Sequence, residues 1–456
     1  MKKPAFMFML VVFASLFIFS GTSAFAASNM SKAATPVTIT VNALSNGNVG
    51  SGFAGFSYEK DRIGAGMFDV KDTNLVNLFR LLGPSVLRLG GNLVDIVNWN
   101  ATGAGGSAKE IAPSDVTRLA AFLRATGWKA LYGINLKTNT PANAASEAQF
   151  ATQALGSNLL AFEIGNEPNF YKSESAYESS YNSYVSAIKA KVPSAVFDGP
   201  GAADNSPGWA TTFAPHEKNN GLVMLAQHMY IGNKTIATIS GMLGSNASGK
   251  LPNGENILGN AQSANGIPQW RMTEANSYFH GGAAGVSNVE AASLWSLDFM
   301  YGIASHHGDG VNFHGGTSTQ FPLNYSPIAF SGLTPTGVQG VYYGELLWEL
   351  AGTGSLHSAT VSGGSSITAW GIGNNVIVNN KGTAAIAATI TLPSSASNAR
   401  EYVLTAPALT STAITIAGSG VNASGAFSPS PQSVSISGNK AVISVPAHSA
   451  ALIVTN

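Results

Sequence analysis

Two glutamates stand where acid–base and nucleophilic chemistry could be combined. Glu167 lies in the segment Phe162–Pro168 (FEIGNEP) and Glu274 lies in Trp270–Asn276 (WRMTEAN). Each follows an apolar run, which predicts that each ends a buried strand. When two carboxyl groups face each other, repulsion and desolvation separate their pKa values, so that one keeps its proton while the other ionises. Such a pair can protonate the leaving oxygen of a glycosidic bond and attack the anomeric carbon.

The elements that would position these glutamates alternate between strands and helices. Eight apolar runs predict strands, in chain order Gly52–Tyr58, Ser85–Gly91, Ala130–Leu136, Leu159–Pro168, Ala195–Gly201, Leu222–Tyr230, Gln269–Asn276 and Gly310–Gly316. Amphipathic segments lie between them, with apolar faces that begin near Leu75, Val116, Tyr177 and Leu294. This alternation favours the α/β class and a (β/α)8 barrel over residues 52–352. An open, doubly wound sheet is the alternative.

The sequence changes character after Gly352. Short alternating runs, separated by Gly, Ser, Asn and Pro, predict a β-sandwich over residues 353–456. The run Val37–Val41 alternates in the same way. It predicts that an N-terminal strand within residues 36–50 joins this sandwich.

Polar residues stand at nearly every predicted strand end. They are Glu59, Asn92, Asn135, Asn166, Glu167, Asp198, His228, Tyr230, Glu274 and His314. The active sites of (β/α)8 barrels lie at the C-terminal ends of the strands. Glu167 would end the fourth strand and Glu274 the seventh, so their carboxyl groups could approach to the ~5–5.5 Å of a retaining glycosidase.

Several motifs together resemble known enzymes. Asn166-Glu167-Pro168, combined with Glu274, resembles the large clan of retaining (β/α)8 glycoside hydrolases. The segments Ser57–Glu59, Leu87–Asn92 and Asn312–Gly316 resemble glycoside hydrolase family 79, which contains β-glucuronidases and heparanase-like enzymes. The resemblance covers essentially the whole mature chain. It implies a barrel with a C-terminal β-sandwich that an N-terminal strand completes.

The resemblance also implies roles for individual residues. Glu167 would be the acid/base and Glu274 the nucleophile, while Asn166 would bind the sugar 2-hydroxyl. Other residues would bind the sugar or support the two glutamates: Glu59, Asn92, Tyr230, Arg88, His228 and His314. Alternatives stay open for three of them: Arg88 as a structural ion pair, His228 as a packed core histidine and Glu59 as a solvated loop carboxylate.

A uronic acid substrate brings a carboxylate that needs hydrogen-bond donors. We expect these from Tyr278, from the N–H groups of Gly315-Gly316 and from Tyr325. Family 79 has a tyrosine about five positions after the nucleophile, where this chain has Phe279, with Tyr278 beside it. Each tyrosine could instead be an ordinary aromatic lining residue.

Composition excludes several classes of function. The chain has 23 Lys plus Arg and 23 Asp plus Glu, so it lacks the charge excess of a nucleic-acid-binding protein. The absence of Cys excludes disulfides, thiolate metal sites and thiol nucleophiles. We expect no cofactor, no metal and no nucleic-acid partner. The expected partner is a carbohydrate, and near-neutrality fits a terminal glucuronide better than a heparin-like polyanion.

Other motifs carry less weight. Gly50–Gly55 matches G-x-G-x-x-G but precedes a strand, and Gly244–Lys250 resembles a P-loop without its Ser or Thr. His306, His307 and His314 lack metal-ligand spacing. Residues 1–26 have the charged, apolar and small-residue regions of a signal peptide, and their apolar run is too short to span a bilayer. We therefore expect a secreted or periplasmic protein with no membrane association after cleavage.

The combined hypothesis is a secreted retaining β-glycoside hydrolase, an exo-acting β-glucuronidase. The alternatives within the clan are a β-xylosidase, an arabinofuranosidase or an endo-acting heparanase-like enzyme. A carbohydrate-binding barrel without catalysis is the alternative outside it.

Overall fold

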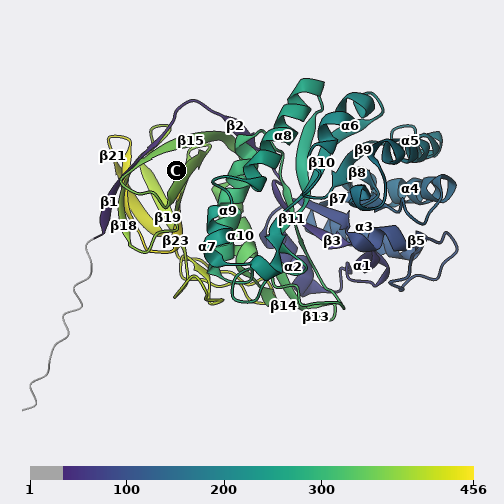
Figure 1. The fold of residues 1–456 in the computed structure, drawn as a ribbon. Helices are drawn as coiled ribbons and strands as arrows, with labels where there is room; N and C mark the ends of the chain where they lie inside the picture. Colours follow the sequence, from purple (N-terminus) through teal and green to yellow (C-terminus); the bar gives the residue numbers. More distant parts are fainter. Residues whose placement is uncertain (1–33, 456) are drawn as a thin grey trace, which may run out of the picture. The chain divides into compact units, whose positions relative to one another are not determined.

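Eight parallel strands close into a barrel in the computed structural model, which describes residues 34–455 (Figure 1). Around the barrel they are β3 (Ala54–Glu59), β4 (Val86–Gly90), β7 (Lys129–Ile134), β8 (Leu159–Ile164), β9 (Phe197–Ala202), β10 (Leu222–Asn233), β11 (Gln269–Phe279) and β12 (Val311–Gly315). Because β12 pairs with β3, the ring is closed. The predicted (β/α)8 barrel is confirmed, and the open-sheet alternative is wrong.

Helices follow the barrel strands and cover the outside of the barrel (Figure 1). They are α1 (Asp61–Gly64), α2 (Thr73–Leu81), α3 (Pro113–Thr126), α4 (Pro141–Leu155), α5 (Glu174–Lys191), α6 (Trp209–Glu217), α7 (Ile239–Gly244), α8 (Lys250–Asn265), α9 (Glu290–Ser305) and α10 (Gly340–Ala351). Helix α3 shows how the sequence determines where a helix begins, which face it buries and where it ends. Pro113 starts it, Val116 and Leu119 are fully buried, and Gly127 ends it with a left-handed φ of 79°.

A second, all-β region consists of two strands that precede the barrel in sequence and nine that follow it. Its eleven strands are β1 (Thr35–Val41), β2 (Gly47–Val49), β15 (Gly354–Ser362), β16 (Ile367–Ile372), β17 (Asn375–Asn380), β18 (Ile386–Thr391), β19 (Asn398–Thr405), β20 (Thr415–Ile416), β21 (Gln432–Ser437), β22 (Lys440–Val445) and β23 (Ser449–Thr455). Strand β1 pairs with both β15 and β18, so the strand path returns on itself around an apolar cluster. A second β region is therefore confirmed, while its division into two facing sheets stays a prediction.

Helix α9 joins the β region to the barrel through buried polar and aromatic contacts. Asn379 donates a hydrogen bond to the carbonyl of Leu294 at 2.8 Å, and Lys381 pairs with Asp298. The rings of Tyr301 and Trp370 stack at 4.8 Å. The barrel wall behind the site is thus packed against the β region.

The remaining short elements are β5 (Asn98–Trp99), β6 (Glu110–Ile111), β13 (Ile328–Ser331), β14 (Thr334–Val338) and the 3₁₀ turns Asn92–Ile96, Gly156–Asn158, Pro168–Phe170 and Lys234–Ile236. Between residues 34 and 455, none of the helices combines the length and the hydropathy that a bilayer crossing needs. The predicted signal peptide, residues 1–26, lies outside the described residues.

Candidate active site

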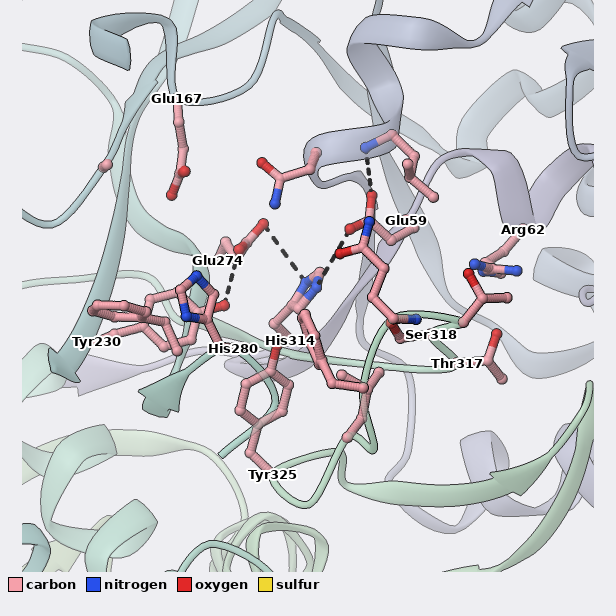
Figure 2. A pocket seen from close by; sticks show the side chains of 18 of the residues that line it. Glu59, Arg62, Glu167, Tyr230, Glu274, His280, His314, Thr317, Ser318 and Tyr325 are labelled. Atoms are coloured by element: carbon pink, nitrogen blue, oxygen red, sulfur yellow. Dashed lines mark hydrogen bonds and ion pairs between the residues drawn. The ribbon is translucent and has the colours of Figure 1, made fainter. Parts of the chain in front are cut away.

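A cavity of about 260 Å³ opens at the carboxyl ends of the barrel strands (Figure 2). Among the predicted site residues it is lined by Glu59, Asn92, Glu167, Tyr230, Glu274, His314 and Tyr325. This volume is slightly below the ≈ 300–1,000 Å³ range of small-molecule sites. It fits one sugar ring with part of its substituent better than a long polymer segment.

Glu167 is aimed into the cavity by an unusual turn. Strand β8 ends at Ile164, and the chain then takes left-handed conformations at Gly165 (φ 86°) and at Glu167 itself (φ 45°). A non-glycine residue in this region stores strain, which occurs often at functional sites. The N–H of Glu167 donates to the carbonyl of Gly201 at 3.0 Å and fixes the turn. The side chain stays 16% exposed, so its carboxyl group can reach a ligand.

Glu274 faces Glu167 across the cavity (Figure 2). One carboxylate oxygen of each glutamate and one ring nitrogen of His228 all lie within 4.8 Å of one another. Tyr230 donates a hydrogen bond to Oε1 of Glu274 at 2.9 Å, and Arg88 donates to Oε2 at 2.6 Å. The structure therefore brings the carboxyl groups of the two glutamates to within 4.8 Å of each other.

The surroundings of Glu274 keep it ionised. Burial by itself raises the pKa of this carboxyl group, but His314, His228, the Arg88 guanidinium and the Tyr230 hydroxyl together lower it well below its usual range. Burial lowers the pKa of His314, so its charge titrates, whereas the charge of Arg88 is permanent. Arg88 is thus the partner that holds the negative charge on Glu274.

Arg88 is the centre of a buried network. It is fully buried and donates to Glu163 Oε1 (2.5 Å), Ser57 Oγ (3.1 Å) and Asn166 Oδ1 (2.8 Å) as well as to Glu274. The Arg88 side chain therefore lies between strands β3, β8 and β11 and fixes the nucleophile candidate relative to Asn166. A structural ion pair, the alternative for Arg88, is present too, with Glu163 as its partner.

His228 connects this network to Glu167. Its Nε2 lies 3.1 Å from Nη2 of Arg88, and its Nδ1 lies 3.1 Å from Oε1 of Glu167. The ring of His228 therefore bridges Arg88 and Glu167 through its two nitrogens. A proton on Nδ1 would let His228 donate to Oε1 of Glu167. His228 is buried, but it is more than a packed core residue.

Two buried acids belong to this network: Glu163, which sequence reasoning missed, and Asp198, which was predicted at a strand end but lies near the start of β9. Glu163 and Asp198 lie beneath Arg88, and both are at most 1% exposed. Burial, followed by the charge of Glu163, raises the pKa of Asp198 well above its usual range, so Asp198 stays protonated beside Glu163. A charged residue inside the apolar strand Phe162–Ile164, matched by Arg88 inside Leu87–Leu89, is the signal that could have found this pair.

The other predicted residues lie around the two glutamates. Glu59 accepts a hydrogen bond from the N–H of Leu93 at 2.7 Å, and His314 Nε2 lies 3.9 Å from its other oxygen. Asn166 is buried, and its Nδ2 donates to Asn92 Oδ1 at 3.4 Å. Tyr325 lines the cavity floor with its ring centroid 6.1 Å from that of Tyr230.

Two predicted contacts are wrong. Tyr278 is buried away from the cavity and donates to the carbonyl of Thr238 at 3.2 Å, because β10 and β11 continue past the barrel rim and Phe279 takes the inward place. Gly316 does not offer a free N–H, since it donates to Oγ of Ser326 at 3.0 Å. Neither residue can bind a uronate carboxylate as expected.

Arg62 is a second residue that sequence reasoning missed. It lies on α1, three positions after Glu59, and is the one Lys or Arg among the side chains lining the cavity within residues 34–455. Its side chain is 11% exposed, and its Nε, 3.3 Å from Asp61, has no hydrogen-bond partner of good geometry. In Figure 2 it lies beyond Glu59, near Thr317 and Ser318, on the side of the cavity away from Tyr230.

The cluster of Glu167, His228 and Glu274 has a composition that could also bind a metal ion. Its oxygens and nitrogens already have other partners, however. Both oxygens of Glu274 accept hydrogen bonds, from Arg88 and Tyr230, and each ring nitrogen of His228 already has a partner, Nε2 in Arg88 and Nδ1 in Glu167. The permanently charged guanidinium of Arg88, 2.6 Å from Glu274, would also repel a metal cation bound there. This donor set fits acid–base chemistry better than metal binding.

Comparisons with known proteins agree with this architecture. No protein-family model matches the chain. A β-glucuronidase from Aspergillus niger is 24% identical over 254 residues, 48% of this chain and 46% of that protein, so the match spans about half of its length. A 4-O-α-L-rhamnosyl-β-D-glucuronidase from Fusarium oxysporum 12S superposes with a TM-score of 0.75 at 21% identity, covering 91% of this chain and all of that one. A family 51 α-L-arabinofuranosidase from Bifidobacterium longum gives 0.69 at 15%, covering 92% and 100%. These structural likenesses establish the fold alone.

Proposed function

We propose that the protein is an exported, retaining β-glycoside hydrolase that removes terminal β-linked glucuronic acid. The observation that carries the proposal is the pair of carboxyl groups, with oxygens within 4.8 Å, of which Glu274 is bonded to Arg88. Retaining enzymes have carboxyl groups ≈ 5–5.5 Å apart, while inverting enzymes need ≈ 6.5–9.5 Å to admit a water molecule. The short spacing favours double displacement. Export rests on residues 1–26 of the sequence alone.

In the first step, Oε of ionised Glu274 attacks the anomeric carbon while Glu167 gives its proton to the departing glycosidic oxygen. The bond to the leaving group breaks, and a glycosyl ester to Glu274 forms. In the second step, Glu167 takes a proton from water, which attacks the same carbon and releases Glu274. Arg88 and Tyr230 hold the attacking carboxylate, and His228 orients Glu167.

The charged residues of the cavity support the proposal that the substrate is an acidic sugar. Arg62 is the one Arg or Lys lining the cavity among the described residues, so its guanidinium is the charged group available to a substrate carboxylate. Glu59 does not repel an anion at neutral pH, because burial and the charge of Glu274 raise its pKa to about 8. The two relatives whose names include glucuronidase agree with an acidic glycone.

Replacing Arg62 with glutamine should weaken catalysis on acidic glycosides selectively. We expect kcat/KM for an aryl β-glucuronide to fall about 10- to 100-fold, because one charge-assisted contact is lost. Any turnover of a neutral aryl β-glycoside should be unchanged. Arg124→Gln, an exposed arginine on α3, is the matched control. Equal losses on the acidic and neutral substrates would show that Arg62 supports the fold instead.

The pKa of Glu59 predicts a pH dependence. Below about pH 8 this carboxyl group is neutral, and above it the group carries a negative charge next to the substrate carboxylate. We therefore expect KM for the glucuronide to rise as pH passes through about 8 in the wild type. Glu59→Gln cannot ionise, so its KM should stay flat in that range. An identical alkaline rise in both proteins would assign the effect to another group.

The proposed function is tested by a panel of aryl β-D-glucuronide, β-D-xyloside, β-D-glucoside and α-L-arabinofuranoside. We expect the highest kcat/KM on the glucuronide. Activity on the xyloside or arabinofuranoside alone would show that the substrate carries a terminal pentose and not glucuronic acid. Sugar binding without turnover of any member would favour the non-catalytic carbohydrate-binding barrel.

A further inference from the structure

Phe170 is a large apolar side chain that the structure leaves in solvent at the edge of the cavity. It is 64% exposed. Five other large hydrophobic side chains in residues 34–455 are similarly exposed: Leu44, Val70, Ile96, Ile236 and Val442. None of these is aromatic, and none lines the cavity, whereas Phe170 does. Single exposed apolar residues are common on protein surfaces, so the position of Phe170 is what sets it apart.

That position is on the same turn as Glu167. The 3₁₀ turn Pro168–Phe170 follows Glu167 directly, and the N–H of Phe170 donates to the carbonyl of Glu167 at 3.0 Å. Glu167 is the group that faces the departing oxygen in the proposed reaction. A ring on this turn therefore borders the space of the leaving group, whereas Arg62 and Glu59 border the space of the sugar that is transferred.

The backbone that carries the ring is firmly held. Asn169 accepts a hydrogen bond from the N–H of Ala203 at 2.9 Å and donates one to Asn205 at 3.1 Å. The N–H of Lys172 donates to the carbonyl of Pro168 at 2.8 Å. A ligand that covers the ring would not have to order the turn first, which lowers the entropic cost of binding.

Charge near this turn is balanced. Asp204 lines the same part of the cavity, but Lys250 pairs with it at 2.6 Å. No other lining residue adds a positive charge here among the described residues, since Arg62 lies beyond Glu59. The rim beside Phe170 thus offers an apolar face with little net charge, which suits a neutral group.

We propose that Phe170 is a binding platform for the leaving group and takes a neutral, flat, apolar face: an aromatic aglycone or the C–H face of a sugar. This inference rests on the proposed glycosidase reaction. Aromatic faces stack on such groups with useful energy, and the ring replaces water over the face that it covers. Phe170 would thus contact the leaving group, whereas Arg62 and Glu59 contact the sugar that is transferred.

The test compares substrates that share a sugar and differ in the leaving group. The series is a 4-methylumbelliferyl β-glucuronide, a β-glucuronosyl disaccharide with a neutral second sugar, and β-glucuronyl fluoride, whose leaving group has no face to stack. Phe170→Ala should lower kcat/KM about tenfold on at least one of the first two substrates, mainly through KM. The fluoride should change by no more than about twofold. Phe170→Tyr should restore the loss, and Val442→Ala is the control for an exposed apolar residue elsewhere.

The pattern of losses identifies the occupant. A loss on the umbelliferyl substrate assigns an aromatic aglycone, and a loss on the disaccharide alone assigns a sugar. An equal loss on the fluoride, or no loss on either bulky substrate, overturns the platform. If the wild type cleaves only xylosides, the glucuronide proposal fails, and the same three leaving groups on xylose still test Phe170. A wild type that cleaves neither glucuronides nor xylosides overturns both the proposed function and the role of Phe170.

Discussion

Glu274→Ala is expected to lower kcat by about four to six orders of magnitude on an aryl β-glucuronide, because no group remains to attack the anomeric carbon. The fold should survive, since Arg88 keeps its ion pair with Glu163 at 2.5 Å. Steady-state kinetics with thermal unfolding of both proteins would show this. Glu255→Gln is the matched control, as it alters a buried carboxyl group that does not line the cavity.

The same variant also tests the direction of attack. Azide is small enough to enter the space vacated by the Glu274 carboxylate, opposite the leaving group. It should partly restore turnover and yield an α-glycosyl azide. A β-azide from this variant would place the nucleophile elsewhere and would contradict the assignment of Glu274.

Glu167→Ala is expected to slow substrates according to their leaving groups. Loss of general acid catalysis costs about 10²–10⁴ in rate when the leaving group needs a proton. A 2,4-dinitrophenyl glycoside, which leaves as a stable anion, should be slowed far less in its first step than a methyl or sugar glycoside. The measurement is a plot of log kcat/KM against leaving-group pKa, which should become much steeper in the variant.

Azide should act differently here. With Glu167 removed, azide replaces the water of the second step and attacks the ester from the open face, giving a β-azide. Glu167→Gln keeps the shape and the contact with His228, so it separates loss of the proton from loss of packing. Equal slowing of all leaving groups would contradict the acid role.

Most strands of the barrel could be predicted because they are buried apolar runs with a polar residue at or near the end; in β9 the polar residue, Asp198, lies near the start instead. The periodic signal does not depend on distant contacts, so the predicted ranges differ from the observed strands only by a few residues at their ends. Strand β1 was recognisable for the same reason, since Val37, Ile39 and Val41 alternate and are all buried. Its simultaneous pairing with β15 and β18 depends on tertiary structure and left no trace in the local pattern.

Helices α4 and α8 were not predicted, and their packing explains why. The buried face of α4 consists largely of alanines, including Ala144, Ala148 and Ala151, which contrast weakly with the exposed face. Helix α8 contains Gly254 and Gly259, which oppose helix formation in isolation. A Cβ at Gly254 would lie 2.2 Å from the terminal methyl group of Met229, so a larger residue there would require that side chain to move.

Much of the site was predictable from apolar runs that lead to a polar residue. Glu167 and Glu274 were found in this way, although β11 continues past Glu274 to Phe279, whereas Arg62 reaches the cavity from a helix that follows the strand. Tyr278 was misplaced because the alternation of an isolated strand does not reveal which residue turns inward beyond the barrel rim. Glu163 was passed over because it lies inside a strand rather than at its end.

In the proposed double displacement, Glu167 transfers the proton and Glu274 attacks the anomeric carbon. The most direct test of this mechanism is the configuration of the first sugar released, followed by ¹H NMR from the start of hydrolysis of an aryl β-glucuronide. We expect the β-anomer to appear first and the α-anomer to grow only by later mutarotation. Initial release of the α-anomer would mean direct displacement by water and would contradict the double displacement.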